Sequence, residues 1–189
     1  MRIISGNFKG KKILQPLDSF TRPLKDLTKE SIFNIIKHSN KFDIHFEKSN
    51  ILDLFSGVGS FGIECISRGA QKVIFVENYH NVLPILKKNL DNLKSEKNYE
   101  NIQNDIYQNF KIEKLKDKFD LIFLDPPYKD KNLINILNNI YKNKILKNEG
   151  IIIMHRHKQE NDLLPDFLSI AEEKKYGIAK ILFLTINLD

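Results

Sequence analysis

Apolar segments alternate with segments of helical periodicity from residue 50 onward, and this alternation constrains the fold more than any other feature of the sequence. The apolar segments predict strands at 50–55, 72–77, 100–104, 119–124 and 151–154. The segments between them predict helices at 61–68, 82–93, 108–116 and 133–145. Strands that are apolar on both faces lie in parallel sheets with helices on each side. The sequence therefore predicts an α/β fold with a parallel sheet.

The C-terminal part of the chain departs from this alternation. Two strand-like runs, 168–175 and 179–187, follow one another without a helix between them. They flank Tyr176-Gly177, a short break of the kind that joins antiparallel strands. The sequence thus predicts an antiparallel hairpin at the end of a mainly parallel sheet.

The first 40 residues form a separate part of the pattern. Short strands are predicted at 2–6 and 11–14, around a turn, and a helix is predicted at 25–38. We therefore expect a small N-terminal extension, residues 1–40, made of a basic hairpin and a helix. Residues 41–189 are expected to form one compact α/β unit.

Composition excludes several classes of protein. The chain has 189 residues, 41% of them hydrophobic, which is enough for one domain with a buried core. It has no apolar run of the roughly 20 residues that a membrane helix needs, and its N-terminus does not resemble a signal peptide. Cys65 is the only cysteine, which excludes an intrachain disulfide and a cysteine-cluster zinc site. His38, His45 and His80 do not have the spacing of metal ligands, so we expect no metal. The absence of a long apolar run predicts no membrane segment, and the single cysteine favours the reducing cytoplasm.

Basic residues are concentrated at the N-terminus. The net charge is +6, and residues 1–30 contribute +4 of it, with seven basic and three acidic groups. A basic segment on a nearly neutral body predicts a polyanionic partner, a nucleic acid, although a solvated lysine-rich surface remains the alternative. The residues expected to contact phosphates are Lys9, Lys11, Lys12 and Arg22.

A glycine-rich loop follows the predicted strand 50–55. Gly57, Gly59 and Gly62 have the spacing G-x-G-x-x-G, and Glu77 ends the next predicted strand, 20 residues after Gly57. This pattern lets the backbone approach an adenosine-containing cofactor while a carboxylate binds the ribose. Asp53 can hold a methionine ammonium but would repel a pyrophosphate. The loop thus favours S-adenosyl-L-methionine over a dinucleotide, and a turn without a ligand remains the alternative.

Two more positions are expected to complete this cofactor site. Asp105 follows the predicted strand 100–104, where its carboxylate could accept a hydrogen bond from an adenine amino group. Aspartates in such loops also cap the next helix, and that structural role remains open. Phe55 lies between Asp53 and the glycines, and we count it among the cofactor-binding residues.

The sequence Asp125-Pro126-Pro127-Tyr128 follows the predicted strand 119–124. Its prolines fix the backbone as it leaves the sheet and hold Asp125 at the strand tip. An exocyclic ring amine is a poor nucleophile, because its lone pair is delocalised into the ring. Hydrogen bonds from the amine to Asp125 and to the Pro126 carbonyl would favour a pyramidal nitrogen, and Tyr128 could stack on the base. We therefore predict that Asp125, Pro126 and Tyr128 act, mainly by positioning, in the methylation of a ring amine.

The whole chain resembles the bacterial methyltransferases of small-subunit (16S) ribosomal RNA that act on a guanine N2. The similar segments that are specific to this family are Arg2-Ile3-Ile4-Ser5-Gly6, Lys9-Gly10-Lys11-Lys12-Ile13, Arg22-Pro23 and Lys29-Glu30-Ser31-Ile32-Phe33-Asn34. Others, shared more widely, are Leu52-Asp53-Leu54-Phe55-Ser56-Gly57, Ser67-Arg68-Gly69-Ala70, Phe75-Val76-Glu77, residues 120–128 and Lys175-Tyr176-Gly177. Many methyltransferases have the glycine loop and the Pro-Pro loop, so the N-terminal segments are the specific part of the resemblance.

The resemblance implies a fold, a reaction and a partner. The implied fold is that of a Rossmann-like class I methyltransferase, with a seven-stranded, mainly parallel sheet and a C-terminal antiparallel hairpin. S-adenosyl-L-methionine is the implied cofactor, the N-terminal extension is expected to contact RNA, and the protein is expected to be a monomer. The expected reaction methylates the exocyclic N2 amine of a guanine in ribosomal RNA, within an assembled or assembling small subunit.

Two positions depart from the family's pattern. Leu24-Lys25 stands where the family tends to have threonines after Arg-Pro, and Met154-His155-Arg156 stands where it usually has a glutamate. These departures weaken the assignment of the target more than that of the chemistry. We expect His155 to be a structural residue at a strand end rather than a pocket residue.

Other functions remain open. An adenine-N6 methyltransferase of another nucleic acid would use the same two loops, but DNA enzymes usually add a recognition region for which this chain has little room. Protein glutamine methyltransferases typically have Asn at the position of Asp125. A NAD-dependent oxidoreductase would account for the glycine loop and Glu77 but not for residues 125–128. A non-catalytic RNA-binding assembly factor with the same fold would not need an intact Asp125 and Tyr128.

Overall fold

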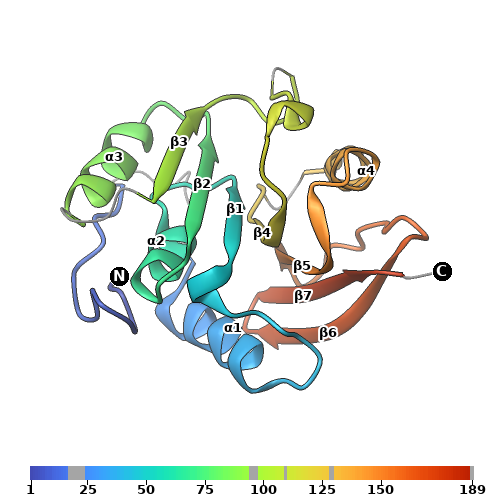
Figure 1. Cartoon of the computed structure of the whole chain (residues 1–189), viewed down its shortest axis with the longest axis horizontal. Coiled ribbons are helices and arrows are strands. Elements are labelled where there is room, and N and C mark those ends of the chain that lie inside the picture. The colour runs from blue at the N-terminus through green and yellow to red at the C-terminus, as the bar shows by residue number, and fades with distance from the viewer. Residues whose placement is uncertain (17–23, 94–97, 109, 128–129, 188–189) are drawn as a thin grey trace.

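The structure, a computed structural model, describes residues 1–16, 24–93, 98–108, 110–127 and 130–187 (Figure 1). Its helices are α1 (Asp26–His38), α2 (Ser60–Ser67), α3 (Leu83–Asp91) and α4 (Leu133–Lys142), with 3-10 turns η1 (Phe46–Lys48) and η2 (Ile112–Lys114). Its strands are β1 (Asn50–Leu54), β2 (Lys72–Glu77), β3 (Tyr99–Gln103), β4 (Phe119–Leu124), β5 (Leu146–His157), β6 (Leu168–Tyr176) and β7 (Ala179–Ile186). None of the helices within these ranges is long and apolar enough to cross a membrane.

All of these strands join one sheet, in the order β3-β2-β1-β4-β5-β7-β6. The first five run parallel, whereas β7 is antiparallel to both β5 and β6. This confirms the predicted seven-stranded, mainly parallel sheet with a C-terminal antiparallel hairpin. The strand order switches between β1 and β4, and ligands of such sheets bind beyond the carboxyl ends of the strands at that switch.

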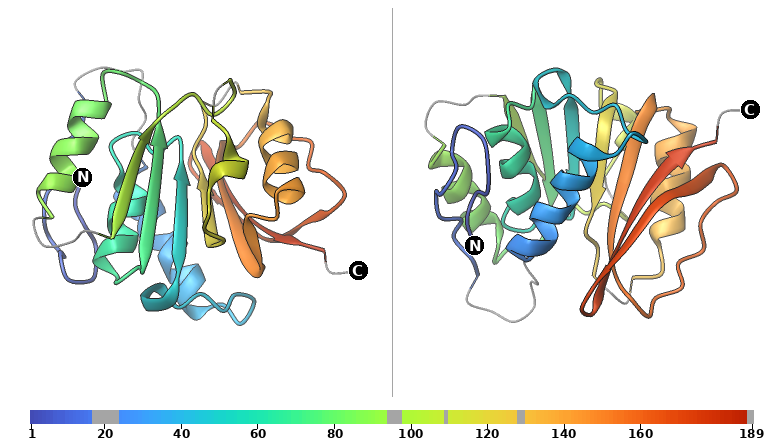
Figure 2. Two further views of the ribbon diagram at one scale, coloured as in Figure 1. Left: turned by 45° about the horizontal axis from the view of Figure 1, so that its top comes forward. Right: turned by 90° about the horizontal axis from the view of Figure 1, so that it is seen from below.

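Helices cover both faces of the sheet (Figure 2). Side chains of α1, α2 and α3 belong to one buried cluster, and those of η2 and α4 belong to the other. Successive strand residues alternate between the two clusters: in β4, Leu121 and Phe123 face the first, while Ile122 and Leu124 face the second. Strands buried on both faces account for the continuous apolar runs in the sequence.

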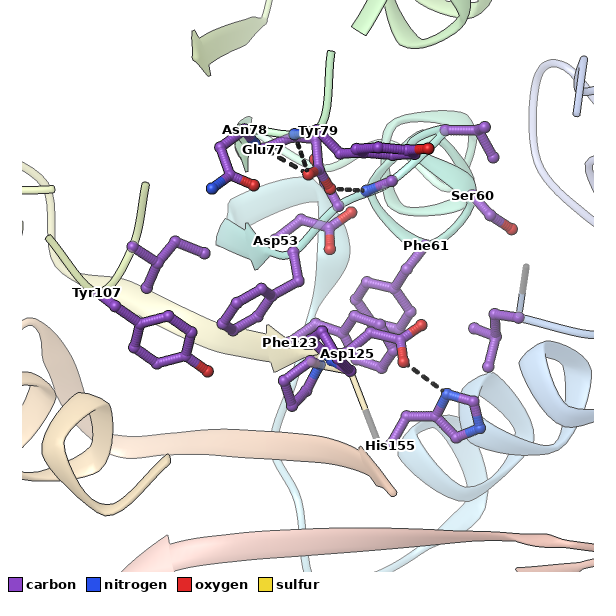
Figure 3. A pocket seen from close by; sticks show the side chains of 18 of the residues that line it. Asp53, Ser60, Phe61, Glu77, Asn78, Tyr79, Tyr107, Phe123, Asp125 and His155 are labelled. Carbon is purple, nitrogen blue, oxygen red and sulfur yellow. Dashed lines mark hydrogen bonds and ion pairs between the residues drawn. The ribbon is translucent and has the colours of Figure 1, made fainter. Parts of the chain in front are cut away.

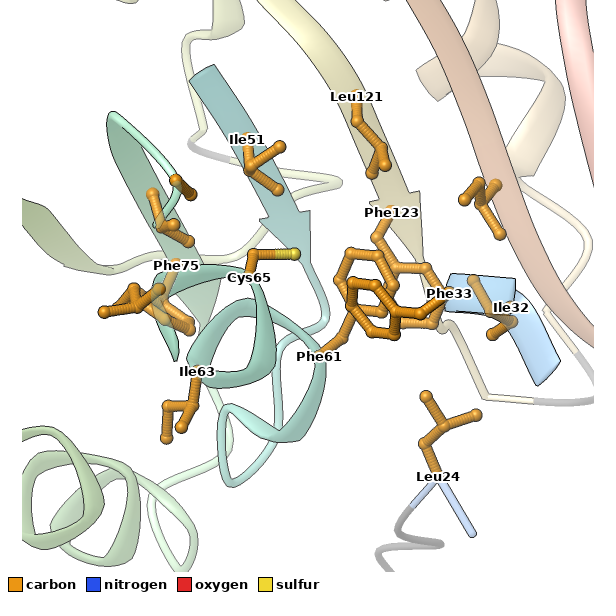
Figure 4. Packing of buried hydrophobic residues seen from close by; sticks show 14 of the residues in the cluster. Leu24, Ile32, Phe33, Ile51, Phe61, Ile63, Cys65, Phe75, Leu121 and Phe123 are labelled. Atoms are coloured by element: carbon orange, nitrogen blue, oxygen red, sulfur yellow. The ribbon is translucent and has the colours of Figure 1, made fainter. Parts of the chain in front are cut away.

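A stack of three aromatic rings joins α1 and α2 to the sheet (Figure 4). The ring of Phe61 in α2 stacks on Phe123 in β4 with a centroid separation of 4.0 Å. On its other side Phe61 stacks on Phe33 in α1, at 5.1 Å. The same stack therefore fixes the position of α1 and reaches the carboxyl end of β4.

The N-terminal segment is attached to α2. The buried Glu64 carboxylate accepts hydrogen bonds from the backbone N–H groups of Ile4 (2.8 Å) and Ser5 (2.9 Å). Gly6 has a φ of 80°, and a Cβ atom there would lie 1.7 Å from the Ser67 carbonyl oxygen. The predicted hairpin of strands at 2–6 and 11–14 forms only in part: Arg2 and Lys12 make an isolated antiparallel bridge, and the backbone N–H groups of Ile3 and Ile13 donate to the carbonyl oxygens of Lys11 (2.9 Å) and Met1 (3.0 Å). The reason is that Ile4 and Ser5 donate to Glu64 instead of to a paired strand.

Two further elements differ from the sequence prediction. β5 spans twelve residues, where a strand at 151–154 was expected. Lys147, Asn148 and Glu149 conceal its beginning in the sequence, because this part of the strand is not buried on both faces. The predicted helix at 108–116 is wrong. Among the described residues of this loop, the helical structure is limited to the 3-10 turn η2.

Candidate active site

A pocket of 930 Å³ lies at the carboxyl ends of β1, β2, β4 and β5 (Figure 3). It brings together most of the predicted site residues, which are Asp53, Phe55, Gly57, Glu77, Asp105, Asp125 and Pro126. Tyr128 lies outside the described residues. Segments far apart in the sequence thus meet in one cavity, because parallel strands end at the same edge of the sheet.

The three glycines of the loop have different roles. A Cβ atom on Gly57, whose φ is 54°, would meet no atom within 4 Å, so the backbone there is open to a ligand. A Cβ atom on Gly59 would lie 2.6 Å from the side chain of Leu86, and one on Gly62 would lie 2.3 Å from the ring of Phe75. We infer that Gly57 allows close approach of a ligand, while Gly59 and Gly62 are required for packing.

Asp53 lies beneath the loop and is almost completely buried. One of its carboxylate oxygens, Oδ2, accepts a hydrogen bond from the Gly62 N–H at 2.9 Å. The other oxygen, Oδ1, is buried and has no hydrogen-bond partner among the described residues. Burial raises the pKa of Asp53 well above its usual value, Asp125 and Glu77 add to the rise, and the Gly62 hydrogen bond opposes it. A cation that bonded to Oδ1 would satisfy this carboxylate.

Glu77 accepts hydrogen bonds from the backbone of two segments that line the pocket. One carboxylate oxygen accepts from the Gly57 N–H at 2.7 Å, and the other accepts from the N–H groups of Asn78 and Tyr79, both at 2.9 Å. A carboxylate has about four lone-pair sites, so these three bonds leave one, on the oxygen that accepts from Gly57, for a ligand hydroxyl. Glu77 therefore shapes the glycine loop in addition to the ribose contact that the sequence predicts.

The loop after β3 closes one side of the pocket. Asp105 Oδ1 accepts hydrogen bonds from the N–H groups of Tyr107 (2.8 Å) and Gln108 (3.3 Å), so Asp105 stabilises the turn of its own loop, although the helix that it was alternatively expected to cap does not form in the described part of the chain. The Tyr107 ring lies 5.5 Å from the ring of Phe55, and its hydroxyl donates to the carboxylate of Asp130. Tyr107 was not predicted, and its only signal is an aromatic residue two positions after Asp105.

Asp125 and His155 form a pair at the other side of the pocket. The Nδ1 atom of His155 lies 2.8 Å from Oδ1 of Asp125. Burial alone lowers the pKa of His155, but the Asp125 carboxylate outweighs this effect, and the pKa of the imidazole is raised. We expected His155 to be a structural residue at a strand end rather than a pocket residue. This expectation is wrong, because His155 lines the pocket. The sequence could not show this, since the contact depends on the pairing of β4 with β5.

Arg156, the next residue of β5, is completely buried and supports the Pro-Pro loop. Its guanidinium donates to the carbonyl oxygens of Pro127 and Asp130, each at 3.0 Å. The same group is paired with the Asp162 carboxylate, at 2.7 Å. These bonds hold the backbone on both sides of Tyr128. Sequence reasoning missed Arg156, although an arginine within an apolar strand signals a buried charge that requires a partner.

The basic N-terminal residues lie away from the pocket. Lys11 donates to the carbonyl oxygen of Asn92 at 3.3 Å, just beyond the C-terminal end of α3. The adjacent turn packs on Ser67, at the C-terminal end of α2, whereas the first residue of α2, Ser60, lines the pocket. Lys9, Lys11 and Lys12 are exposed, and Arg22 falls outside the described residues.

The charge of the pocket indicates the kind of cofactor that it suits. Five acidic residues, Asp53, Glu77, Asp105, Asp125 and Glu160, line it, and its described wall contains no lysine or arginine. S-adenosyl-L-methionine has a sulfonium and an ammonium, so it suits this wall, whereas the pyrophosphate of a dinucleotide does not. No group of three or more His, Cys, Asp or Glu side chains in the described part of the chain could hold a metal ion.

Comparison with known proteins gives matches along nearly the whole chain. The family described as conserved hypothetical protein 95 matches residues 1–185. An rRNA methyltransferase of Bacillus subtilis, so named provisionally, is 34% identical and covers 96% of both chains. Ribosomal RNA small subunit methyltransferase D of Haemophilus influenzae is 32% identical, over 94% of this chain and 90% of the relative. The solved structure of an Escherichia coli protein, provisionally named a methyltransferase, has a TM-score of 0.78 and 25% identity, over 100% of this chain and 99% of that one.

Proposed function

Since this chain belongs to the family described as conserved hypothetical protein 95, we propose that it is an S-adenosyl-L-methionine-dependent methyltransferase that modifies the exocyclic N2 amine of a guanine in small-subunit ribosomal RNA. Relatives that are similar over nearly their whole length are named ribosomal RNA small subunit methyltransferase D. One observation carries the proposal: Asp53, whose buried Oδ1 has no hydrogen-bond partner in the described part of the chain, and Asp125, at the end of the neighbouring strand, line the same pocket.

The residues around the glycine loop would hold the cofactor. Asp53 Oδ1 would accept from the methionine ammonium, and Glu77 would accept from a ribose hydroxyl group. Phe55 and Asp105 would contact the adenine. When bound, the cofactor supplies a methyl group on a sulfonium, whose sulfur keeps the electron pair of the broken bond.

The residues at the end of β4 would hold the acceptor base. Asp125 and the Pro126 carbonyl accept hydrogen bonds from the amine, which directs the nitrogen lone pair away from the ring plane. Asp125 can then accept the proton that the nitrogen loses after it is methylated. Tyr128 is proposed to stack on the base. Arg156 keeps this loop in place through its bonds to Pro127 and Asp130.

The distribution of basic residues favours a large RNA substrate. Lys9, Lys11 and Lys12 lie near the ends of α2 and α3 that point away from the pocket. The eight residues of α2 alone correspond to about 12 Å of helix. An RNA that contacts these lysines and also enters the pocket must extend over the side of the molecule, which suits a folded subunit better than a short oligonucleotide.

The direct test is to identify the methylated nucleoside. The protein is incubated with radiolabelled cofactor and with either free 16S RNA or small subunits that lack the modification, and the RNA is digested to nucleosides. We expect label in N2-methylguanosine and more label with subunits. Label in N6-methyladenosine, or label in protein alone, contradicts the proposed target.

The buried carboxylate of Asp53 gives a prediction about cofactor affinity. In Asp53→Asn the amide oxygen can still accept from Gly62, but an NH₂ group replaces the unpaired oxygen and repels an ammonium. We expect S-adenosyl-L-methionine to bind about 10- to 150-fold more weakly, which corresponds to the 1.5–3 kcal/mol of a hydrogen bond to a charged group. Isothermal titration calorimetry measures this, with NAD as the control ligand. Unchanged affinity, or tight binding of NAD, contradicts the assignment.

The same variant has a pH signature without cofactor. Because the pKa of Asp53 is raised in the folded protein, the carboxyl ionises first in the unfolded state as the pH rises above about 4. Asp53 therefore lowers the stability of the ligand-free protein increasingly until the pH passes its folded pKa. Thermal melting should show Asp53→Asn to be more stable than wild type at pH 8 and to lose this advantage toward pH 4.

The N-terminal lysines give a prediction about RNA affinity. In the triple variant Lys9→Ala/Lys11→Ala/Lys12→Ala, the slope of log affinity against log salt should fall by about 0.7–0.9 for each lysine that contacts a phosphate. Filter binding of small subunits at several salt concentrations measures the slope. The matched control is Lys114→Ala/Lys142→Ala/Lys144→Ala, which removes three exposed lysines from the opposite face of the sheet. Equal slopes in wild type and both variants would mean that the N-terminal lysines only solvate the surface.

A further inference from the structure

The partner of Asp125 is fixed by the pairing of two strands. β4 and β5 are parallel neighbours in which Leu124 is opposite Met154. One residue further along each strand, Asp125 and His155 therefore emerge side by side and on the same face of the sheet. Their side chains meet with 2.8 Å between Oδ1 and Nδ1 (Figure 3).

The direction of this hydrogen bond follows from the chemistry of the two groups. An ionised carboxylate can only accept, so Nδ1 of His155 must carry the proton and donate it. Among the charged groups that act on the ring, Asp125 favours the imidazolium and Arg156 opposes it. The raised pKa of His155 fits the role of donor.

The burial of the pair is asymmetric. The side chain of His155 is 7% exposed and that of Asp125 is 20% exposed. The imidazole thus stands behind the carboxylate in the pocket wall, and it occupies one of the two carboxylate oxygens. The second oxygen, Oδ2, is the one available to a substrate amine. Without the imidazole, the carboxylate could rotate about its Cβ–Cγ bond and present either oxygen.

We propose that His155 is a positioning residue, which orients Asp125 by donating Nδ1–H to Oδ1 and thereby reserves Oδ2 for the substrate amine. This inference rests on the proposed function, because it assigns a role toward the amine that Asp125 is proposed to bind. Arg156, the residue after His155 in β5, also stabilises this arrangement, because it donates a hydrogen bond to the loop that follows Asp125. Adjacent residues of one strand thus orient the carboxylate and the loop.

Two substitutions separate orientation from simple packing. His155→Leu fills the space but removes the donor, whereas the Nδ2 amide of His155→Asn can donate from about the position of the imidazole Nδ1. For His155→Leu we expect kcat with small subunits to fall about 10- to 100-fold, the effect typical of losing a supporting hydrogen bond, with KM and cofactor affinity almost unchanged. His155→Asn should recover most of that loss. If His155 only fills space, both variants keep kcat within about twofold of wild type, and that result overturns the proposal.

A second measurement does not depend on activity. In the ligand-free protein, NMR titration of the imidazole resonances should place the pKa of His155 above that of an unperturbed histidine, and Asp125→Asn should lower it. If the pKa of His155 is the same in wild type and in Asp125→Asn, the two side chains are not paired, and this result overturns the proposal. If wild type methylates no RNA at all, the proposed function fails, while the titration still decides whether His155 and Asp125 are paired. Thermal melting of each variant verifies that it is folded.

Discussion

Replacement of Asp125 by alanine is expected to lower the rate of methyl transfer by about 100- to 1,000-fold, the range found when one preorganised hydrogen-bonding group that acts on the transition state is removed. The side chain is at the end of β4, in the wall of the pocket, and it is the proposed acceptor for the amine. Its loss removes an interaction with the substrate and leaves the glycine loop intact. The affinity for S-adenosyl-L-methionine should therefore stay within about threefold of wild type, a change below 1 kcal/mol.

Single-turnover kinetics with small subunits, together with calorimetry of cofactor binding, measures both effects. Asp125→Asn is the matched variant, because it retains one carbonyl oxygen and the shape of the side chain, and it should lose less activity than Asp125→Ala. A rate for Asp125→Ala within tenfold of wild type contradicts the proposed role of Asp125. Thermal melting is needed as a control, because Asp125→Ala also removes a hydrogen-bond partner of the buried His155.

Replacement of Arg156 by methionine is expected to lower both stability and turnover. The guanidinium is completely buried and paired with Asp162, whose buried carboxylate keeps the more distant Lys180, at 4.0 Å, when the arginine is removed. Removing one partner of a buried ion pair costs about 3–5 kcal/mol of unfolding free energy. Turnover should fall as well, because the carbonyl groups of Pro127 and Asp130 lose the donor that fixes the loop between them.

A double variant separates the two effects of Arg156. Arg156→Met/Asp162→Leu removes both charges, so it should recover part of the lost stability, while turnover should remain low because the loop still lacks its donor. Arg156→Lys retains the charge but cannot reproduce a planar group with several fixed donors. Its stability and its turnover should therefore lie between those of wild type and those of Arg156→Met. Denaturant unfolding and single-turnover kinetics measure these differences. Equal recovery of stability and turnover in the double variant contradicts a positioning role.

Local patterns in the sequence determined the sheet and the cofactor side of the pocket. Apolar runs separated by helical segments predicted the parallel sheet, because strands buried on both faces need apolar side chains at every position. The positions of Asp53, Gly57 and Glu77 followed from their places at strand ends, since all parallel strands end at one edge. The Pro-Pro loop placed Asp125 at the same edge by the same reasoning.

Other local signals were insufficient. The strands predicted in the first 14 residues pair only at one bridge, because the buried carboxylate of Glu64, about 60 residues away, accepts from Ile4 and Ser5. The beginning of β5 was concealed by polar residues, which are tolerated there because this part of the strand is not buried on both faces. No local pattern indicated that the N-terminal lysines lie at the ends of α2 and α3 that point away from the pocket.

Only the tertiary structure decided how Asp125 is supported. His155 and Arg156 are about 30 residues distant from their partners in the chain, and their contacts depend on the register between β4 and β5. A shift of that register by one residue would exchange the faces of the two side chains, so Arg156 would point at Asp125 and His155 at the loop. Sequence periodicity specifies that a strand exists and which faces are apolar. The choice of partner across the sheet is made by packing of the whole domain.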